Sequence, residues 1–303
     1  MIPMTLAETA QAVSGSLRLF GDDTAETVVS GLVDTDSRLM TSGAIFVAKP
    51  GAVADGHSFV GAAVDAGARL AIVERPVDEP VSQIVVADAV RALADLARVV
   101  VARVRERGDL KVVGITGSNG KTTTKNLVAR ILQDEGETVA PRNSFNNEVG
   151  APVTMLRVRE STRYLVSEFG ASRIGRIAEL AGLVTPDIGA VLMVGLAHAG
   201  GFGGVEATQR AKTELVQAVR PGGTAVLNAD DPRVAAMAAV AEERGVSVRW
   251  FGRSQAAQVR AEDVEVTASG TTCVVVAGEE RHPLRLRVLG EHHVMNALAA
   301  ITI

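Results

Sequence analysis

The clearest pattern of apolar positions lies in residues 87–107, where apolar side chains recur every three or four residues. This spacing predicts an amphipathic helix. Gly108 follows it, and glycine is a common residue just past the C-terminal end of a helix. We therefore expect a domain boundary here, with one domain over residues 1–107 and a second over residues 108–303.

Short apolar runs in the first domain predict strands, and they are AIFVA, RLAIVE and QIVVA. Helix-like stretches separate these runs. Strands that alternate with helices in a segment of about a hundred residues are typical of a small α/β domain.

The second domain is predicted to have a P-loop-type α/β fold with a mostly parallel sheet and helices on both faces. Its predicted strands are KVVGIT, YLVSE, IGAVLMV, TAVLN and SVRWF. The stretch VEVTASGTTCVVVAG predicts a β-hairpin that turns at Ser269 and Gly270, and therefore a small antiparallel extension of the sheet. The final residues, HHVMNALAAITI, predict a helix without a stop signal, so we expect that part of the protein is missing after Ile303.

Composition narrows the class of protein. A chain of 303 residues that is 47% hydrophobic and 22% charged is typical of a globular protein with two domains. The net charge of −4 provides no positive field for phosphate backbones, so we expect small-molecule partners and no nucleic acid. We expect neither a secretory signal nor membrane insertion, and the lone Cys273 can form no internal disulfide. These features predict a cytoplasmic protein.

The stretch KVVGITGSNGKTTTKNLVARIL predicts a strand, a glycine-rich turn and a helix. Such a turn directs backbone N–H groups and the positive end of the helix at a phosphate chain. Lys121 is expected to reach the outer phosphates, and the Thr122 hydroxyl to bind Mg²⁺. The usual pattern G-x-x-x-x-G-K-[ST] has glycine where this chain has Ile115, and a simple helix entry is the competing interpretation. The loop residues predicted to bind ATP are Gly117, Ser118, Asn119, Gly120, Lys121, Thr122 and Thr123.

Polar side chains follow several predicted strands. Glu168 ends YLVSE, His198 lies four residues past IGAVLMV, and the NADD sequence at 228–231 closes TAVLN. Taken singly, each has an ordinary interpretation: a turn acid, a satisfied histidine and a helix cap. The carboxyl ends of parallel strands share one edge of a sheet, which is where ligands bind in open α/β folds. We therefore predict a Mg²⁺ site built from Thr122, Glu168 and His198.

Several separated motifs occur in a fixed order, namely TGSNGKTTT, NSFNNEVGAP, SEFGASRIGRI, the AH of GLAHAGGFG, RAKTEL, NADD and GEHHVMNALAA. With these motifs the chain resembles the Mur ligases from about Asp34 to Ile303, most closely the branch that adds D-Ala-D-Ala to UDP-MurNAc-tripeptide. The resemblance implies an ATP-dependent amide-bond ligase of peptidoglycan precursor synthesis. In this reaction the ATP γ-phosphate passes to a substrate carboxylate, and an amine then attacks the acyl phosphate.

The resemblance also implies roles for individual residues. Lys212 matches a position where the family carries a carbamylated lysine, and with Lys121 and His198 it is expected to be catalytic. Asn296 matches an asparagine that contacts adenine. Immediately before it the family usually has His-Asn where this chain has His292-His293. The first domain is expected to bind the UDP-sugar, and the second is expected to bind ATP.

Three side-chain amides are concentrated in the segment NSFNNEVGAP. In the family this segment approaches the nucleotide-sugar substrate, and an amide can donate and accept hydrogen bonds without adding charge. Asn146 or Asn147 is also expected to cap a helix that enters at Glu148. The residues expected to bind UDP-MurNAc-tripeptide are Ser37, Arg38, Asn143, Asn146 and Asn147.

Three other functions compete with this interpretation. The first is a sister Mur ligase that adds the third peptide residue, whose members usually carry threonines in place of the asparagines. The second is a P-loop NTPase or phosphotransferase, which would need no nucleotide-sugar domain. The third is a protein that only binds these ligands, which is expected if the chain ends at Ile303 and lacks the domain that closes over ATP.

Overall fold

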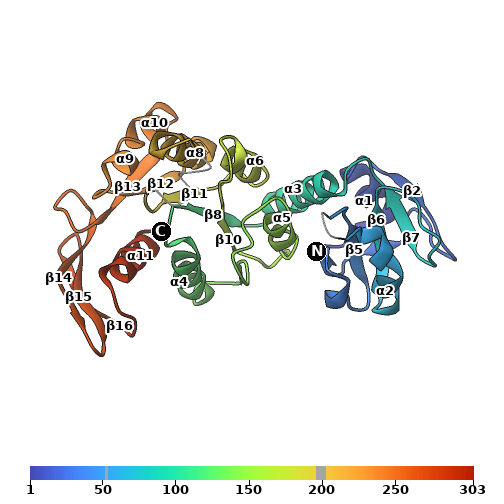
Figure 1. Cartoon of the computed structure of the whole chain (residues 1–303), viewed down its shortest axis with the longest axis horizontal. Coiled ribbons are helices and arrows are strands. Elements are labelled where there is room, and N and C mark those ends of the chain that lie inside the picture. The colour runs from blue at the N-terminus through green and yellow to red at the C-terminus, as the bar shows by residue number, and fades with distance from the viewer. Residues whose placement is uncertain (52–53, 196–202) are drawn as a thin grey trace. The chain divides into compact units, whose positions relative to one another are not determined.

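The computed structural model describes residues 1–51, 54–195 and 203–303 (Figure 1). These residues form two compact units. Unit 1 consists of Met1–Leu110 and Glu148–Thr162, and unit 2 consists of Lys111–Asn147 and Arg163–Ile303. The chain therefore returns to unit 1 for a second segment, which the sequence analysis had assigned to the second domain. Among the described residues, no helix is long and apolar enough to span a membrane.

Unit 1 contains a five-stranded sheet in the order β2-β7-β6-β5-β4, and a separate antiparallel pair formed by β1 and β3. Strands β4 to β7 are parallel, whereas β2 lies antiparallel at one edge. The three predicted strands are confirmed as β5, β6 and β7. The strand bounds are β1 (Met4–Thr5), β2 (Ser16–Arg18), β3 (Val28–Val29), β4 (Val33–Asp34), β5 (Ala44–Ala48), β6 (Ala68–Val73) and β7 (Ser82–Val85).

The helix predicted from apolar spacing is confirmed as α3, which begins at Ala89 because the Asp88 side chain accepts hydrogen bonds from two backbone N–H groups of the first turn. The short helix α5 is entirely buried and packs against α3. Its side chains therefore belong to the core of unit 1. The helices of this unit are α1 (Leu6–Ala12), α2 (Val60–Asp65), α3 (Ala89–Arg107) and α5 (Gly150–Met155), with 3₁₀ turns η1 (Ser37–Leu39) and η2 (Gly56–Phe59).

Unit 2 contains a nine-stranded sheet in the order β16-β15-β14-β13-β12-β11-β8-β10-β9. Pairing is parallel from β14 to β9, and β14, β15 and β16 pair antiparallel. The predicted parallel sheet, the hairpin and the antiparallel extension are all confirmed. The strands are β8 (Lys111–Thr116), β9 (Thr138–Val139), β10 (Tyr164–Glu168), β11 (Ile188–Val191), β12 (Thr224–Asn228), β13 (Ser247–Gly252), β14 (Val259–Thr267), β15 (Gly270–Ala277) and β16 (Glu280–Leu286).

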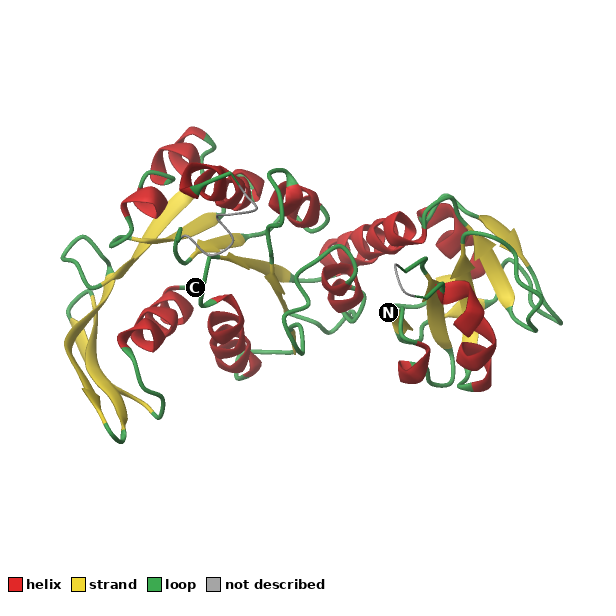
Figure 2. Cartoon of the chain, in the orientation of Figure 1, coloured by secondary structure: helices red, strands yellow, loops and turns green. Residues whose placement is uncertain are grey.

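Helices cover both faces of this sheet (Figure 2). Side chains alternate between the faces, so Val226 of β12 packs in the core with α4 and α11, whereas Ala225 and Leu227 pack on the opposite face with α8, α9 and α10. The helices of unit 2 are α4 (Lys121–Gln133), α6 (Arg176–Gly182), α8 (Val205–Ala218), α9 (Pro232–Ala235), α10 (Ala238–Glu243) and α11 (Glu291–Thr302).

The carboxyl ends of β8, β10, β11 and β12 meet at one edge, because these strands are parallel neighbours. The glycine-rich turn follows β8, Glu168 ends β10, and the NADD sequence begins at the end of β12. The fold therefore brings together three of the motifs that are far apart in the sequence.

Candidate active site

The turn between β8 and α4 forms an open loop at the start of a helix. Gly120 is the N-cap residue of α4 and has a left-handed backbone, with φ of +84°. The left-handed backbone favours glycine at this position, and a Cβ atom here would also displace the side-chain oxygen of Asn296. No side chain of the described residues caps this end of α4, which leaves its first N–H groups available to an anion.

Contacts within unit 2 fix the loop against the neighbouring strands. The Ser118 backbone N–H donates to Met193 O at 3.0 Å. The Ser118 hydroxyl accepts from Gly195 N at 2.8 Å and lies 3.2 Å from Gly195 O. The Lys121 ammonium folds back over the loop and donates to Gly117 O at 2.8 Å. Burial lowers the pKa of Lys121, and the negative charge of Glu168 opposes that shift.

A hydrogen-bonded cluster lies beside the loop and connects it to β10. The Thr122 hydroxyl donates to Glu168 Oε2 at 3.0 Å, and Asn146 Nδ2 donates to Glu168 Oε1 at 2.8 Å. The Ser144 hydroxyl lies 3.0 Å from Thr122 Oγ1. A hydroxyl has one proton, so Ser144 donates to Thr122 while Thr122 donates to Glu168. Glu168 is only 1% exposed, and the hydrogen bonds from Thr122 and Asn146 fix the positions of its oxygens.

This cluster lines a small cavity of about 270 Å³ together with the phosphate loop. The cavity contains carboxylate, hydroxyl and amide oxygens, the ligand types that Mg²⁺ prefers. Among the described residues, no group of three His, Cys, Asp or Glu side chains could hold a metal ion. His198, the third predicted metal ligand, lies outside the described residues. The cavity lining consists of Ser118, Asn119, Gly120, Lys121, Thr122, Thr123, Ser144, Asn146 and Glu168.

Lys212 is a buried cation on α8 and is 5% exposed. Burial and, to a smaller extent, the positive charge of Lys121 together lower its pKa to about 8. The ammonium groups of Lys121 and Lys212 are therefore close enough to repel each other. A substantial fraction of Lys212 is therefore a neutral amine near physiological pH.

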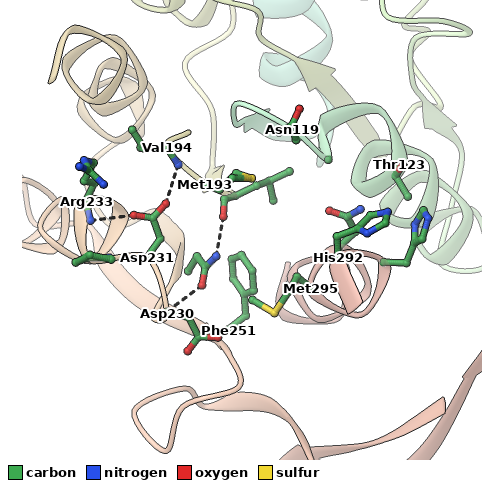
Figure 3. Close-up of a pocket in the computed structure, with 16 residues that line it drawn as sticks. Asn119, Thr123, Met193, Val194, Asp230, Asp231, Arg233, Phe251, His292 and Met295 are labelled. Atoms are coloured by element: carbon green, nitrogen blue, oxygen red, sulfur yellow. Dashed lines mark hydrogen bonds between the residues drawn. The ribbon is translucent and has the colours of Figure 1, made fainter. Parts of the chain in front are cut away.

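A second, larger cavity of about 810 Å³ also borders the loop (Figure 3). The phosphate loop contributes Asn119, Gly120 and Thr123, and α11 contributes Asn296. His292 and His293 lie at the start of α11, with their ring centroids 4.1 Å apart. Partial burial and the neighbouring His292 lower the pKa of His293. The remaining lining residues are Leu192, Met193, Val194, Asn228, Asp230, Asp231, Pro232, Arg233, Phe251 and Met295.

The NADD sequence fixes one wall of this cavity. Asn228 Nδ2 donates to Leu192 O at 2.9 Å, and Asp231 Oδ2 accepts from Val194 N at 2.7 Å (Figure 3). The other Asp231 oxygen accepts from the first backbone N–H groups of α9, so the ordinary interpretation of this residue as a helix cap is correct for half of its carboxylate. The sequence did not indicate the contact with Val194, which joins the carboxyl ends of β11 and β12.

The substrate residues predicted in the asparagine segment differ in their surroundings. Asn146 reaches Glu168, whereas Asn143 and Asn147 are exposed. Helix α5 begins at Gly150 with Val149 as its N-cap residue, two residues later than the predicted entry at Glu148. The capping role of Asn146 or Asn147 stays a prediction. In the structure, Asn146 orients Glu168 through their hydrogen bond. Ser144 joins the same cluster through Thr122, and no sequence pattern indicated this.

The other predicted substrate residues lie in unit 1. Ser37 and Arg38 form the 3₁₀ turn that follows β4. The Arg38 side chain is 86% exposed, and its Nε and Nη2 donate to the two carboxylate oxygens of Asp36 at 2.8 and 2.6 Å. This ion pair holds the guanidinium in solvent at the carboxyl end of a parallel strand.

The fold and the glycine-rich loop define a P-loop-type α/β protein. The chain belongs to the Mur ligase family, since the Mur ligase middle domain matches residues 115–303 and the Mur ligase family catalytic domain matches residues 31–107.

Curated relatives cover the whole chain. It is 41% identical to a UDP-N-acetylmuramoyl-tripeptide--D-alanyl-D-alanine ligase of Mycobacterium tuberculosis, with 100% of this chain and 63% of that protein aligned. It is 33% identical to the ligase of the same name in Escherichia coli, over 99% of this chain and 64% of that protein. The chain thus spans a little under two thirds of the length of these relatives.

Solved structures give the same relationship. A crystal structure of MurF from Acinetobacter baumannii has a TM-score of 0.86 and 34% identity, and covers 99% of this chain and 64% of that one. MurF from Thermotoga maritima in complex with ADP has a TM-score of 0.77 and 28% identity, and covers 90% of this chain and 62% of that one. The α/β fold predicted from the sequence is confirmed, and it is the fold of these Mur ligase structures.

Proposed function

We propose that this protein is an ATP-dependent ligase that joins D-Ala-D-Ala to UDP-MurNAc-tripeptide in peptidoglycan precursor synthesis. The observation that carries the proposal is the cluster of Thr122, Glu168 and Asn146 beside Lys121 and the phosphate loop. Relatives that carry this reaction in their names align with the chain over its whole length. The biosynthetic role makes the cytoplasm the expected location.

The chemistry requires activation of a carboxylate, which is a poor acyl donor. A carboxylate oxygen of the tripeptide attacks the γ-phosphorus of ATP, the bond to the β-phosphate oxygen breaks, and ADP leaves. The amine of D-Ala-D-Ala then attacks the carbonyl carbon, inorganic phosphate leaves, and the amine loses a proton. Bringing triphosphate and carboxylate together concentrates negative charge, so the Lys121 ammonium and the N–H groups of the loop stabilise the transition state.

The cavity beside the loop fits Mg²⁺. Thr122 and Glu168 are adjacent oxygen donors, and they would hold the ion together with phosphate oxygens and water. His198 is the proposed third ligand. When bound, Mg²⁺ neutralises charge on the phosphates. Asn146 holds the carboxylate of Glu168 in orientation, which is the role expected of a group behind a metal ligand.

Lys212 is proposed to carry a carbamate. An ammonium next to Lys121 and a divalent cation would be repelled, whereas a carbamate is an anion and would attract both. Carbamate formation requires a neutral amine, and the lowered pKa of Lys212 supplies one.

Three groups of residues are proposed to contact the rest of the substrates. Ser37 and Arg38 bind the diphosphate of the UDP-sugar, with the Arg38 fork as the charged donor. Exposed Asn143 and Asn147 bind the nucleotide-sugar through their amides. Asn296 lies in the larger cavity and contacts adenine, which makes that cavity the base pocket.

A coupled phosphate assay on the full-length native protein tests the function. Release of phosphate from ATP is expected only when both UDP-MurNAc-tripeptide and D-Ala-D-Ala are present, so each is omitted in turn. Release without the dipeptide would instead identify an NTPase. Activity with a single amino acid and the UDP-dipeptide would identify the sister ligase that adds the third peptide residue.

A further inference from the structure

Lys125 is a fully buried lysine that none of the steps above uses. It lies on α4, one turn after Lys121, and its side chain is 0% exposed. Its ammonium donates to Pro141 O at 2.6 Å. Burial lowers the pKa of Lys125, and the negative charge of Glu168 opposes that shift, so an anion compensates the buried cation. A helical lysine usually extends into solvent, and this one does not.

The carbonyl that Lys125 binds is the start of the asparagine segment, which we define as residues 141–147. This segment lies between β9 and α5 and belongs to neither a helix nor a strand. Proline has no N–H, so the carbonyl is the only backbone group of buried Pro141 that can form a hydrogen bond. An unpaired buried carbonyl is unfavourable, and Lys125 is the donor that pairs it.

Three further contacts depend on where this segment lies. Ser144 donates to Thr122, the Asn146 side chain donates to Glu168, and Asn146 O accepts from Gly170 N at 3.1 Å. In the part of the chain that the structure describes, the segment belongs to no strand ladder, and these contacts together with the bond at Pro141 help to hold it in place. Lys125 supplies a charged donor to that set, and hydrogen bonds with a charged donor are stronger than neutral ones.

We propose that Lys125 is a positioning residue, whose buried ammonium anchors the asparagine segment against α4 so that Ser144 and Asn146 reach Thr122 and Glu168. Lys121 and Lys125 thus divide two tasks on successive turns of one helix. Lys121 faces the loop and the reacting phosphates, whereas Lys125 faces the core and holds the segment. The kinetic part of the test below rests on the proposed function, and the structural part does not.

Limited trypsin digestion of the full-length protein tests the anchor directly. Arg142 is exposed within the segment, one residue after the carbonyl that Lys125 holds, so cleavage after Arg142 reports release of the segment. The variant Lys125→Met keeps an unbranched side chain, one atom shorter, and removes both the charge and the donor. Cleavage after Arg142 is expected to become about tenfold faster or more, because a charge-assisted bond is lost. Cleavage after exposed Arg287 is the internal control and is expected to stay unchanged.

A matched variant separates the anchor from general loss of charge on α4. Arg130→Met removes a positive charge from the same helix, at an exposed side chain that forms an ion pair with Asp134 four residues on. It is expected to leave cleavage after Arg142 at the wild-type rate. Should Lys125→Met not fold, Lys125→Gln keeps an amide donor, and a rate between those of wild type and a released segment is then expected.

Kinetics provide the readout that a purely structural role would not change. Because the segment carries Asn143 and Asn147, Lys125→Met is expected to raise the KM for UDP-MurNAc-tripeptide about tenfold. Because Asn146 orients Glu168, the Mg²⁺ concentration for half-maximal activity is expected to rise as well. A role in stability alone would lower the active fraction and leave the KM and the Mg²⁺ midpoint unchanged. Unaltered cleavage after Arg142 in a folded Lys125 variant overturns the inference, whatever the wild-type enzyme catalyses. Wild-type protein without dipeptide-dependent phosphate release overturns the proposed function and leaves the digestion result to stand alone.

Discussion

At the scale of single residues, burial decides which polar groups of the site can react. Glu168, Lys125 and Lys212 are all nearly inaccessible to water. Glu168 accepts hydrogen bonds from Thr122 and Asn146, and Lys125 donates to Pro141 O. Lys212 sits beside another cation, so its protonated form is the disfavoured one. The chemistry of this lysine should therefore depend on pH.

Carbamate formation on Lys212 is expected to increase with pH. Its pKa of about 8 lies below the ordinary lysine value, so the neutral amine rises from about a tenth of the molecules at pH 7 to about nine tenths at pH 9. At constant dissolved ¹³CO₂, the carbamate signal in ¹³C NMR should grow over this range. Lys212→Arg removes the acceptor amine, and a signal that persists in that variant would assign the carbamate to another group.

Glu168→Gln is expected to separate charge from hydrogen bonding at the cavity beside the loop. Glutamine can still accept from Thr122 through one oxygen, but it carries no charge for a divalent cation. The Mg²⁺ concentration that gives half-maximal activity should rise about tenfold or more. Titration of activity with Mg²⁺ measures this, and an unchanged midpoint would remove Glu168 from the metal site. Glu179→Gln, an exposed carboxylate on α6, is the control.

At the scale of elements, the site is a set of strand ends and helix starts. The loop between β8 and α4 directs N–H groups outward, while β10, β11 and β12 supply side chains at the same edge. The hydrophobic cores on the two faces of the sheet hold the strands and helices in place. Substitutions in the loop and substitutions in these cores therefore test different properties, namely activity and stability.

Lys121→Ala is expected to lower turnover about a thousandfold, because it removes the cation that we propose stabilises the transferred phosphate. Binding of the UDP-substrate should change little, since Ser37 and Arg38 belong to unit 1 and the loop belongs to unit 2. Isothermal titration calorimetry with UDP-MurNAc-tripeptide measures this binding. Equal loss of turnover and of substrate affinity would contradict separate contacts.

Helix α11 is expected to stabilise unit 2 through one face only. Leu298 is 0% exposed in the core beneath the sheet, whereas Ile301 is 44% exposed on the same helix. Leu298→Ala should lower the free energy of unfolding by about 2–5 kcal/mol, and Ile301→Ala by less than about 1 kcal/mol. Urea unfolding followed by circular dichroism compares the two. Similar losses would mean that α11 is not packed as described.

Apolar spacing predicted these elements well, because the strands of both sheets are short runs bounded by turn residues and α3 has a clear helical period. It could not predict the buried lysines. Lys125 and Lys212 both occur in helical patterns where a lysine normally covers the surface, and only their neighbours in space show that they are enclosed. The hydrogen bond between Asn146 and Glu168 joins residues 22 positions apart, and no local pattern indicates it.

At the scale of the whole molecule, the chain leaves unit 1 after Leu110, forms the phosphate loop and the asparagine segment, and returns for Glu148–Thr162. Sequence patterns gave no reason to expect this return, because an apolar helix such as α5 carries no mark of which core it joins. The assignment of the two domains to UDP-sugar and to ATP stays a prediction.

The discontinuous course of unit 1 affects its synthesis on the ribosome. The first 110 residues emerge before α5 exists, so the surface of α3 that α5 covers is open while β8, the loop and α4 are being translated. A nascent chain at this stage has an uncovered apolar face, the kind of surface that trigger-type chaperones protect. The phosphate loop is therefore synthesised before unit 1 can complete its folding.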